Sequence, residues 1–143
     1  MIVIDGKDMI LGKLASHVAK ELLKKEEMII LNAEHIIITG NKKDIMEKYL
    51  KRRSIKPKQN PSHRPKWPRV PNLLVRRVVR GMVPYSSSRG REAYKRLRVV
   101  EGIPEKYKEK ISDKNYDKLK SKSLKKFITV KQLCEYLGYN GWF

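Results

Sequence analysis

The residues best equipped for chemistry in this sequence are its arginines, which are confined to one part of the chain. All 11 arginines lie between Arg52 and Arg98, and residues 48–98 hold 17 Lys and Arg against a single acid, Glu92. A guanidinium is a planar fork of donors that holds phosphate with two hydrogen bonds and stacks on flat rings. Because so many like charges repel one another, this stretch is expected to face a polyanion.

The remaining sequence is much less basic. The chain has 143 residues, a formal net charge of +19 and a pI of about 10.1, but residues 1–47 carry a net charge of only −1. Residues 99–143 carry +4, and their lysines alternate with acids as on an ordinary solvated surface. The hydrophobic share of 40 % is normal for a globular protein, and the length suits one domain.

Membrane and secreted proteins are disfavoured by composition. The longest apolar runs have four residues, as in 28–31, far below the roughly 18 of a membrane span. The first eight residues include two acids where a signal peptide would be apolar. Cys134 is the only cysteine, which excludes a disulfide framework and a cysteine cluster for zinc. We therefore expect a cytoplasmic protein with no membrane association.

No arrangement of residues predicts catalysis. The phosphate-binding loop, the dinucleotide-binding glycine pattern and the common zinc and serine-hydrolase motifs are all absent from the sequence. His17, His35 and His63 are scattered, and Asp5 with Asp8 is more typical of a turn than of a carboxylate pair. We expect no catalytic residue, no metal and no cofactor.

Apolar spacing predicts alternating strands and helices in the first third of the chain. Residues 1–4 are typical of a short buried strand, and spacings of three and four residues predict a helix over 11–25. The apolar runs 29–31 and 35–39 fit either one strand with an irregular end or two short strands. A second helix is predicted over 42–53. Alternation of this kind favours a mainly parallel sheet with helices on both faces.

Residues 54–71 break this pattern because they contain five of the seven prolines. Five prolines in fifteen residues exclude a helix or a central strand. We therefore predict an extended basic loop. Its tryptophan, Trp67, would either stack on a base or sugar or fasten the loop to the protein, and the sequence favours neither.

Regular structure is predicted to resume after the loop. Asn72 is a suitable N-cap for a helix that reaches Met82, and a further helix extends to about Leu97. A short strand follows at 98–101. Farther along, Thr129 can cap a last helix.

The helix over 72–82 predicts two chemically different faces. Arg76, Arg77 and Arg80 share one side. The opposite, core-facing side holds Val75, Val78, Val79 and Met82. Basic helices beside a basic loop suit RNA of irregular shape, whose phosphates point in several directions. The candidate RNA-binding residues are Lys42, Lys43, Lys51, Arg52, Arg53, Lys56, Lys58, His63, Arg64, Lys66, Trp67, Arg69, Arg76, Arg77, Arg80, Ser88, Arg89, Arg91, Lys95, Arg96 and Arg98.

Several short motifs in residues 1–104 resemble the signatures of one family. They are Val3–Gly6 with Leu11–Ser16, Leu31–Glu34 with Thr39–Lys42, Val79–Pro84, and the pattern Gly90-Arg91-x-x-Tyr94-x-Arg96-Leu97-x-Val99. In this order they resemble the universal ribosomal protein thirteen of the large subunit. The Pro/Arg-rich segment 54–71 is similar to the archaeal and eukaryotic branch, and the short C-terminus favours the archaeal form.

The resemblance implies a three-layer α/β/α fold with a four-stranded, mainly parallel sheet. It implies a structural, non-enzymatic constituent of the large ribosomal subunit that binds large-subunit ribosomal RNA early in assembly and helps it to fold. Its partners would be this RNA and neighbouring ribosomal proteins, with one copy in each ribosome. Residues 1–104 would form the RNA-binding core, including the loop, and residues 105–143 a Lys-rich extension with a terminal helix.

Two other functions compete with this one. A nucleotide-using RNA-modifying enzyme of α/β fold would retain a nucleotide or cofactor during purification. A general nucleic-acid-coating protein would bind any duplex with similar affinity, whereas a ribosomal protein would prefer one folded RNA region at matched salt.

Overall fold

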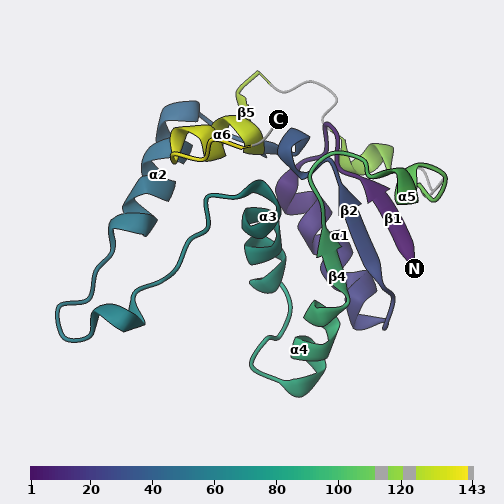
Figure 1. The fold of residues 1–143 in the computed structure, drawn as a ribbon, viewed down its shortest axis with the longest axis horizontal. Helices are drawn as coiled ribbons and strands as arrows, with labels where there is room; N and C mark the ends of the chain where they lie inside the picture. The colour runs from purple at the N-terminus through teal and green to yellow at the C-terminus, as the bar shows by residue number, and fades with distance from the viewer. Residues whose placement is uncertain (112–115, 121–124, 142–143) are drawn as a thin grey trace.

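The computed structural model describes residues 1–111, 116–120 and 125–141 (Figure 1). The helices in these residues are α1 (Leu11–Leu23), α2 (Lys42–Ser54), α3 (Pro71–Arg80), α4 (Ser88–Lys95), α5 (Glu105–Lys108) and α6 (Val130–Tyr136). The strands are β1 (Ile2–Asp5), β2 (Met28–Leu31), β3 (Ile37–Thr39), β4 (Leu97–Val99) and β5 (Phe127–Thr129). No helix in this described part is long and apolar enough to cross a membrane.

The main sheet has three parallel strands in the order β1-β2-β4. The prediction of four strands in one sheet is wrong for the described residues, because β3 pairs antiparallel with β5 in a separate small sheet. Asn32 after β2 takes a left-handed conformation (φ 52°), and a 3₁₀ turn at Ala33–His35 follows it. The chain is thereby redirected, and the Ile37 N–H donates to the Met9 carbonyl at 2.8 Å. Of the two alternatives for this part of the chain, two short strands is confirmed: β2 ends at Leu31 and β3 begins at Ile37.

Each face of the main sheet has its own apolar cluster. Ile4, Met28, Ile30, Leu97 and Val99 belong to the larger cluster, which also contains the buried side chains of α1, α3 and α6. On the opposite face, a smaller cluster of buried strand residues is covered by Tyr107 of α5 and by Ile111. Alternation of side chains along a strand produces these two faces. The prediction of a mixed α/β fold with a parallel main sheet is confirmed. The second face is covered only by the four-residue α5 and Ile111, so the three-layer α/β/α arrangement stays a prediction.

Helix α1 buries the apolar stripe that its spacing predicts. The buried residues of this helix are Leu11, Leu14, Ala15, Val18, Ala19 and Leu22. Helix α3 departs from its prediction. It begins at Pro71 with Val70 as N-cap, not at Asn72, because proline favours the first helical position, where its missing N–H costs nothing. Met82, predicted to face the core, is 42 % exposed.

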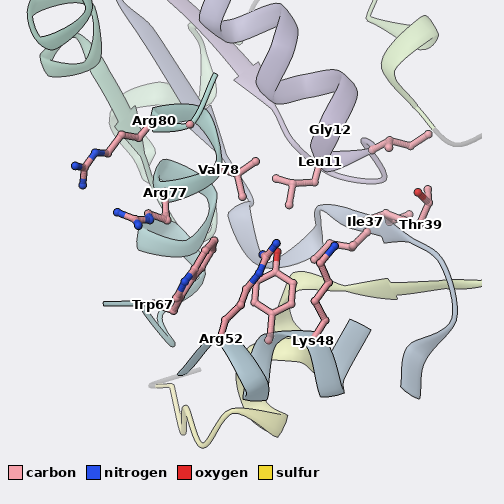
Figure 2. A pocket seen from close by; sticks show the side chains of 14 residues that line it. Leu11, Gly12, Ile37, Thr39, Lys48, Arg52, Trp67, Arg77, Val78 and Arg80 are labelled. Atoms are coloured by element: carbon pink, nitrogen blue, oxygen red, sulfur yellow. The ribbon is translucent and has the colours of Figure 1, made fainter. Parts of the chain in front are cut away.

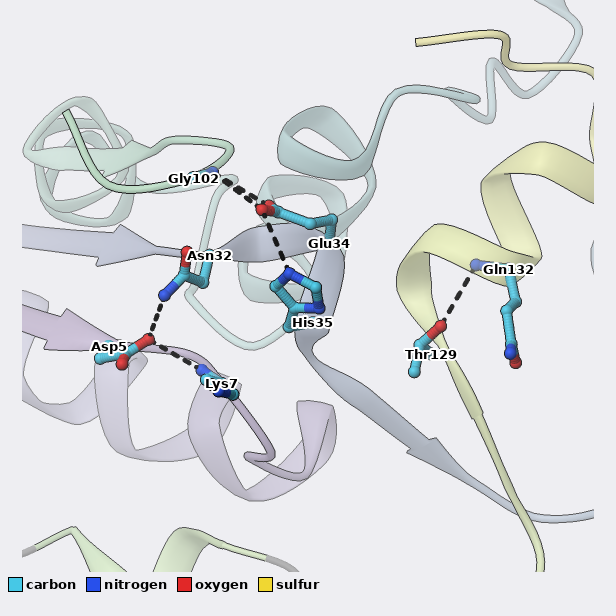
Figure 3. A network of polar contacts seen from close by, with 8 residues as sticks. All are labelled: Asp5, Lys7, Asn32, Glu34, His35, Gly102, Thr129 and Gln132. Atoms are coloured by element: carbon cyan, nitrogen blue, oxygen red, sulfur yellow. Dashed lines mark hydrogen bonds and ion pairs between the residues drawn. The ribbon is translucent and has the colours of Figure 1, made fainter. Parts of the chain in front are cut away.

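The last helix is part of the larger cluster. Ile128, Val130, Leu133 and Cys134 are fully buried there. As predicted, Thr129 caps α6, and its hydroxyl accepts a hydrogen bond from the Gln132 N–H at 3.3 Å (Figure 3). Burial raises the pKa of the Cys134 thiol to about 12, so this side chain is a neutral core residue at physiological pH.

Polar side chains tie together the carboxyl ends of the three parallel strands (Figure 3). The Asn32 amide donates to an Asp5 carboxylate oxygen at 2.7 Å, and the same oxygen accepts from the Lys7 N–H at 3.0 Å. The buried Glu34 carboxylate accepts from the Gly102 N–H at 2.9 and 3.2 Å. Enzymes with parallel sheets commonly bind cofactors at this edge. Here the polar side chains join the strand ends to one another.

Gly90 in α4 lies against the turn that precedes the helix. A Cβ at this position would collide with the carbonyl group of Pro84. We predict that Gly90→Ala lowers the free energy of unfolding by about 1–3 kcal/mol, because the backbone must move to accept the methyl group. Urea denaturation followed by circular dichroism measures this.

The matched control is Gly12→Ala in α1, where a Cβ would have no heavy atom within 4 Å. This change is expected to stabilise the helix by about 0.5–1 kcal/mol, since alanine loses less backbone entropy on folding. Equal denaturation midpoints for the two variants would contradict the close approach at Gly90.

Candidate nucleic-acid interface

The basic residues are presented by α2, α3 and the long loop between them. The loop, residues 55–70, extends away from the body of the protein and returns to begin α3 (Figure 1). A 3₁₀ turn at Pro61–His63 shapes its outer part. There the Asn60 side-chain oxygen accepts from both the N–H and the hydroxyl of Ser62, at 3.1 and 2.6 Å. Prolines and this turn restrict the conformations of a segment that has no sheet to support it.

Trp67 fastens the returning half of the loop to both helices. Its ring meets Tyr49 of α2 edge to face, with centroids 5.8 Å apart. The guanidinium carbons of Arg52 and Arg77 lie 4.5 and 5.2 Å from the Trp67 ring centre. The Arg53 guanidinium donates to the Trp67 carbonyl at 2.7 Å. The sequence left two roles open for Trp67: stacking on a base or sugar, and fastening the loop to the protein. In this structure Trp67 packs on the protein.

Two more arginines of α3 rest on tyrosine rings. The guanidinium carbon of Arg80 is 4.1 Å from the ring centre of Tyr85, and that of Arg76 is 5.1 Å from the ring centre of Tyr94. Each cation–π contact at an exposed site contributes about 0.5–1 kcal/mol. The rings fix the direction of the side chains without neutralising their charge.

The arginines have no acidic partners within the described residues. The ion pairs there involve the N-terminal amine, Lys24 and His35, but no arginine. Other arginines donate to backbone carbonyls: Arg91 to Ser86 at 2.8 Å, and Arg96 to Leu22 at 3.3 Å. The positive charge of this surface is therefore held in place and left available to an external anion.

Three arginines around the loop are close enough to affect one another. Burial, followed by the charges of Arg69 and Arg64, lowers the pKa of the Arg53 guanidinium. The group stays cationic at neutral pH, and a bound phosphate would relieve the repulsion. A small cavity of about 130 Å³ lies between Arg53, Arg64, Lys66 and Trp67.

A larger cavity of about 620 Å³ opens between α1, α2, β3 and α3 (Figure 2). We call it the interhelical cavity. Its lining residues are Ile10, Leu11, Gly12, Ile37, Ile38, Thr39, Lys48, Tyr49, Arg52, Trp67, Arg77, Val78, Arg80 and Gly81. Figure 2 shows Lys48 and Arg52 extending from α2 toward Leu11 and Val78. The cavity therefore combines an apolar wall with inward-pointing cations.

The predicted residues Lys42 and Lys43 lie in the first turn of α2, roughly 8–15 Å along the helix axis from Lys48 and Arg52. They line a second cavity of about 540 Å³ with Lys125, Lys126 and Phe127. The backbone of Gly40 is fixed there by a hydrogen bond from its N–H to the Lys126 carbonyl at 3.1 Å. This second group of cations is separate from the arginine surface.

Comparison with known proteins identifies the chain. A family model described as Ribosomal protein L13 matches residues 1–106. The chain belongs to the ribosomal protein L13 family. The resemblance seen in the sequence motifs is therefore confirmed, and this membership favours a ribosomal protein over an RNA-modifying enzyme.

Members of the L13 family from archaea and from an animal resemble the chain over nearly its whole length. The Large ribosomal subunit protein uL13 of Methanocaldococcus jannaschii is 44 % identical over 141 residues, covering 96 % of this chain and 98 % of that protein. The Archaeoglobus fulgidus protein of the same name is 41 % identical over 97 % of this chain and 88 % of its own length. The Caenorhabditis elegans protein is 38 % identical over 96 % of this chain and 69 % of its own length.

The other predicted residues of this L13-family chain lie outside the two larger cavities. Lys95, Arg96 and Arg98 line a cavity of about 180 Å³ that Glu27 also lines, beside the sheet. The predicted residues that are exposed and line none of the four cavities are Lys51, Lys56, Lys58, His63, Arg69, Ser88, Arg89 and Arg91. The structure thus gathers part of the predicted set around Trp67, and spreads the rest over the loop, α4 and the sheet.

Three cavity-lining cations, Lys48, Lys125 and Lys126, were not among the residues predicted from the sequence. Lys48 could have been predicted from the sequence, because residues four apart share a helix face and Arg52 was already a candidate. The two other lysines are in a weakly patterned Lys-rich segment that resembles a solvated surface. Only the pairing of β5 with β3 brings them to the start of α2.

We predict that Trp67→Ala loosens the loop while the sheet stays folded, since the ring joins the loop to α2 and α3. Trypsin, which does not cleave a bond that precedes proline, should then cleave after Lys58 and Arg69 several-fold faster than in the unmodified protein. Limited proteolysis with mass spectrometry measures the rate. Trp67→Phe is the control, because it keeps an aromatic ring and should be cleaved at an intermediate rate. Cleavage of Trp67→Ala at the unmodified rate would refute the fastening role.

Proposed function

We propose that this protein is a structural constituent of the large ribosomal subunit, where it binds large-subunit ribosomal RNA and helps it to fold during assembly. The relatives are named as large ribosomal subunit proteins, and the family match covers most of the chain. The observation that carries the proposal is the set of arginines held on aromatic rings and carbonyls without acidic partners. The protein would act in the cytoplasm, as one copy beside neighbouring ribosomal proteins.

The mechanism is electrostatic binding by a preorganised surface. Each guanidinium that meets a phosphate releases condensed counterions from the RNA, which favours association. Because Tyr85, Tyr94 and Trp67 already position their arginines, less side-chain entropy is lost on binding than for free side chains. The loop, α3 and α4 present charge in different directions, which suits the irregular backbone of a folded RNA.

The two parts of the chain would have different tasks. Residues 1–104 would provide the RNA-binding core, including the basic loop. Residues 105–143 would be a Lys-rich extension, whose terminal helix packs on the core and whose Lys125 and Lys126 reach a second part of the RNA. The burial of Ile128 and Leu133 supports this arrangement, because it anchors the extension.

The double variant Arg76→Glu with Arg80→Glu tests the arginine surface. If the protein engages about 8 phosphates, log K should fall with log salt at a slope of roughly −6 to −7. The double variant should weaken binding to large-subunit RNA at least tenfold and make the slope less negative by about 1.4–1.8, since two contacts are lost. Filter binding at several salt concentrations measures both quantities.

A charge-matched control is Lys20→Glu with Lys106→Glu, at exposed positions on α1 and α5. It should weaken binding much less, and circular dichroism should show that both double variants remain folded. Normal entry of the arginine double variant into large subunits would show that the RNA-facing surface lies elsewhere. A slope near zero for the unmodified protein would exclude RNA binding through phosphates.

A further inference from the structure

We propose that the interhelical cavity receives one unstacked nucleotide of the bound RNA. Its base would lie on the apolar wall of the cavity, and its phosphate would meet Lys48 and Arg52. This inference rests on the proposed function and names a particular binding site within it. Three features of the cavity carry it: its shape, its charge and the direction of the arginines at its edge.

The cavity has the size and the wall that a flat base requires. Its volume of about 620 Å³ falls within the roughly 300–1,000 Å³ typical of sites that enclose a small organic ligand. Ile38, Val78 and the ring of Trp67 line the cavity, are only partly buried and supply its accessible apolar surface, whereas the lining residues Leu11 and Ile37 are already buried. Sequence-specific and shape-specific RNA recognition commonly uses bases that have left the stack and lie on protein side chains. A base in the cavity would remove this apolar surface from water.

The charge of the cavity is entirely positive. None of its lining residues, all of which lie in the described part of the chain, is acidic. Lys48 and Arg52 point inward (Figure 2), and the Arg52 guanidinium is held 5.2 Å from the ring centre of Tyr49 and 4.5 Å from that of Trp67. The cavity also meets the start of α1 at Gly12. Ile10 offers this helix no side-chain cap, so the positive end of the helix dipole adds to the attraction.

The arginines at the edge of the cavity point in a different direction. Figure 2 shows that Arg77 and Arg80 extend from α3 away from Leu11 and Val78. They can therefore hold the neighbouring phosphates of a strand that passes outside, while one nucleotide turns inward. An acidic protein segment would satisfy the cations alone, and an apolar one would satisfy the wall alone. A nucleotide brings a flat base and a phosphate together, and for this reason we favour RNA as the occupant.

Gly12→Leu tests the site by filling it without removing a charge. A Cβ at Gly12 would have no heavy atom within 4 Å, and leucine suits a helix, so the variant should fold. The control is Ser16→Leu, an exposed position on the same helix that does not line the cavity. Both variants and the unmodified protein are bound to large-subunit ribosomal RNA and irradiated with ultraviolet light. The crosslinked peptides and nucleotides are then identified by mass spectrometry.

We expect the unmodified protein and Ser16→Leu to crosslink one nucleotide to the peptide containing Tyr49 or the one containing Trp67. Gly12→Leu should lose this crosslink and bind the RNA about tenfold more weakly. Its salt slope should change by less than one unit, because at most one phosphate contact is lost. Retention of both the crosslink and the affinity by Gly12→Leu would overturn the nucleotide site.

A second pair of variants tests the charge. Lys48→Met removes an inward-pointing cation, and Lys20→Met removes an exposed one from α1. Only Lys48→Met should weaken the crosslink and make the salt slope less negative by about 0.7–0.9. Equal effects of the two variants would overturn the role given to Lys48.

The outcomes separate this inference from the proposed function. Tight, RNA-selective binding by the unmodified protein with no crosslink at the cavity would overturn the site alone. A crosslink from the cavity to a neighbouring protein in assembled subunits would do the same. Equal affinity of the unmodified protein for large-subunit RNA and for an unrelated duplex would instead overturn the proposed function.

Discussion

Repulsion among closely spaced arginines is the constraint on which the rest of this structure depends. A surface with 11 arginines and almost no acids would be unfavourable if the side chains were free to approach one another. The described structure separates them with aromatic rings and backbone carbonyls instead of pairing them with carboxylates. This arrangement keeps the net charge high while fixing the positions of many of the guanidinium groups. The nearly neutral first 47 residues supply much of the apolar body that supports this surface, and α3, β4 and α6 complete it.

The apolar body that supports the arginine surface is built from few elements. Three parallel strands form its centre, and α1 and α3 cover one face with side chains spaced for burial. The basic loop has no strand or α-helix of its own, so its position follows from Trp67 and from α2 and α3. The charged surface is thus an extension of the core packing, because α2 and α3 each bury apolar residues on one side and present arginines on the other.

Local patterns predicted much of this fold, and distant contacts explain the rest. The helix over 11–25, the loop over 54–71 and the cap at Thr129 were readable because spacing, proline content and capping act within a few residues. The fourth strand was misplaced because the left-handed Asn32 redirects the chain, and antiparallel pairing with β5 joins segments 90 residues apart in sequence. The interhelical cavity was not predictable for the same reason, since four separated elements build it. Its cation Arg52 was recognised, but its wall at Leu11 and Ile37 was indistinguishable from ordinary core.

The pairing of β3 with β5 also affects the order in which the chain matures during synthesis. Residues 127–137 complete the larger apolar cluster, yet they leave the ribosome after every arginine has already emerged. The basic segment is consequently exposed to nearby RNA while the core is still open. Long-range closure of this kind is slow compared with helix formation. A nascent chain of this topology therefore passes through a stage in which its basic segment is exposed before its hydrophobic core is complete.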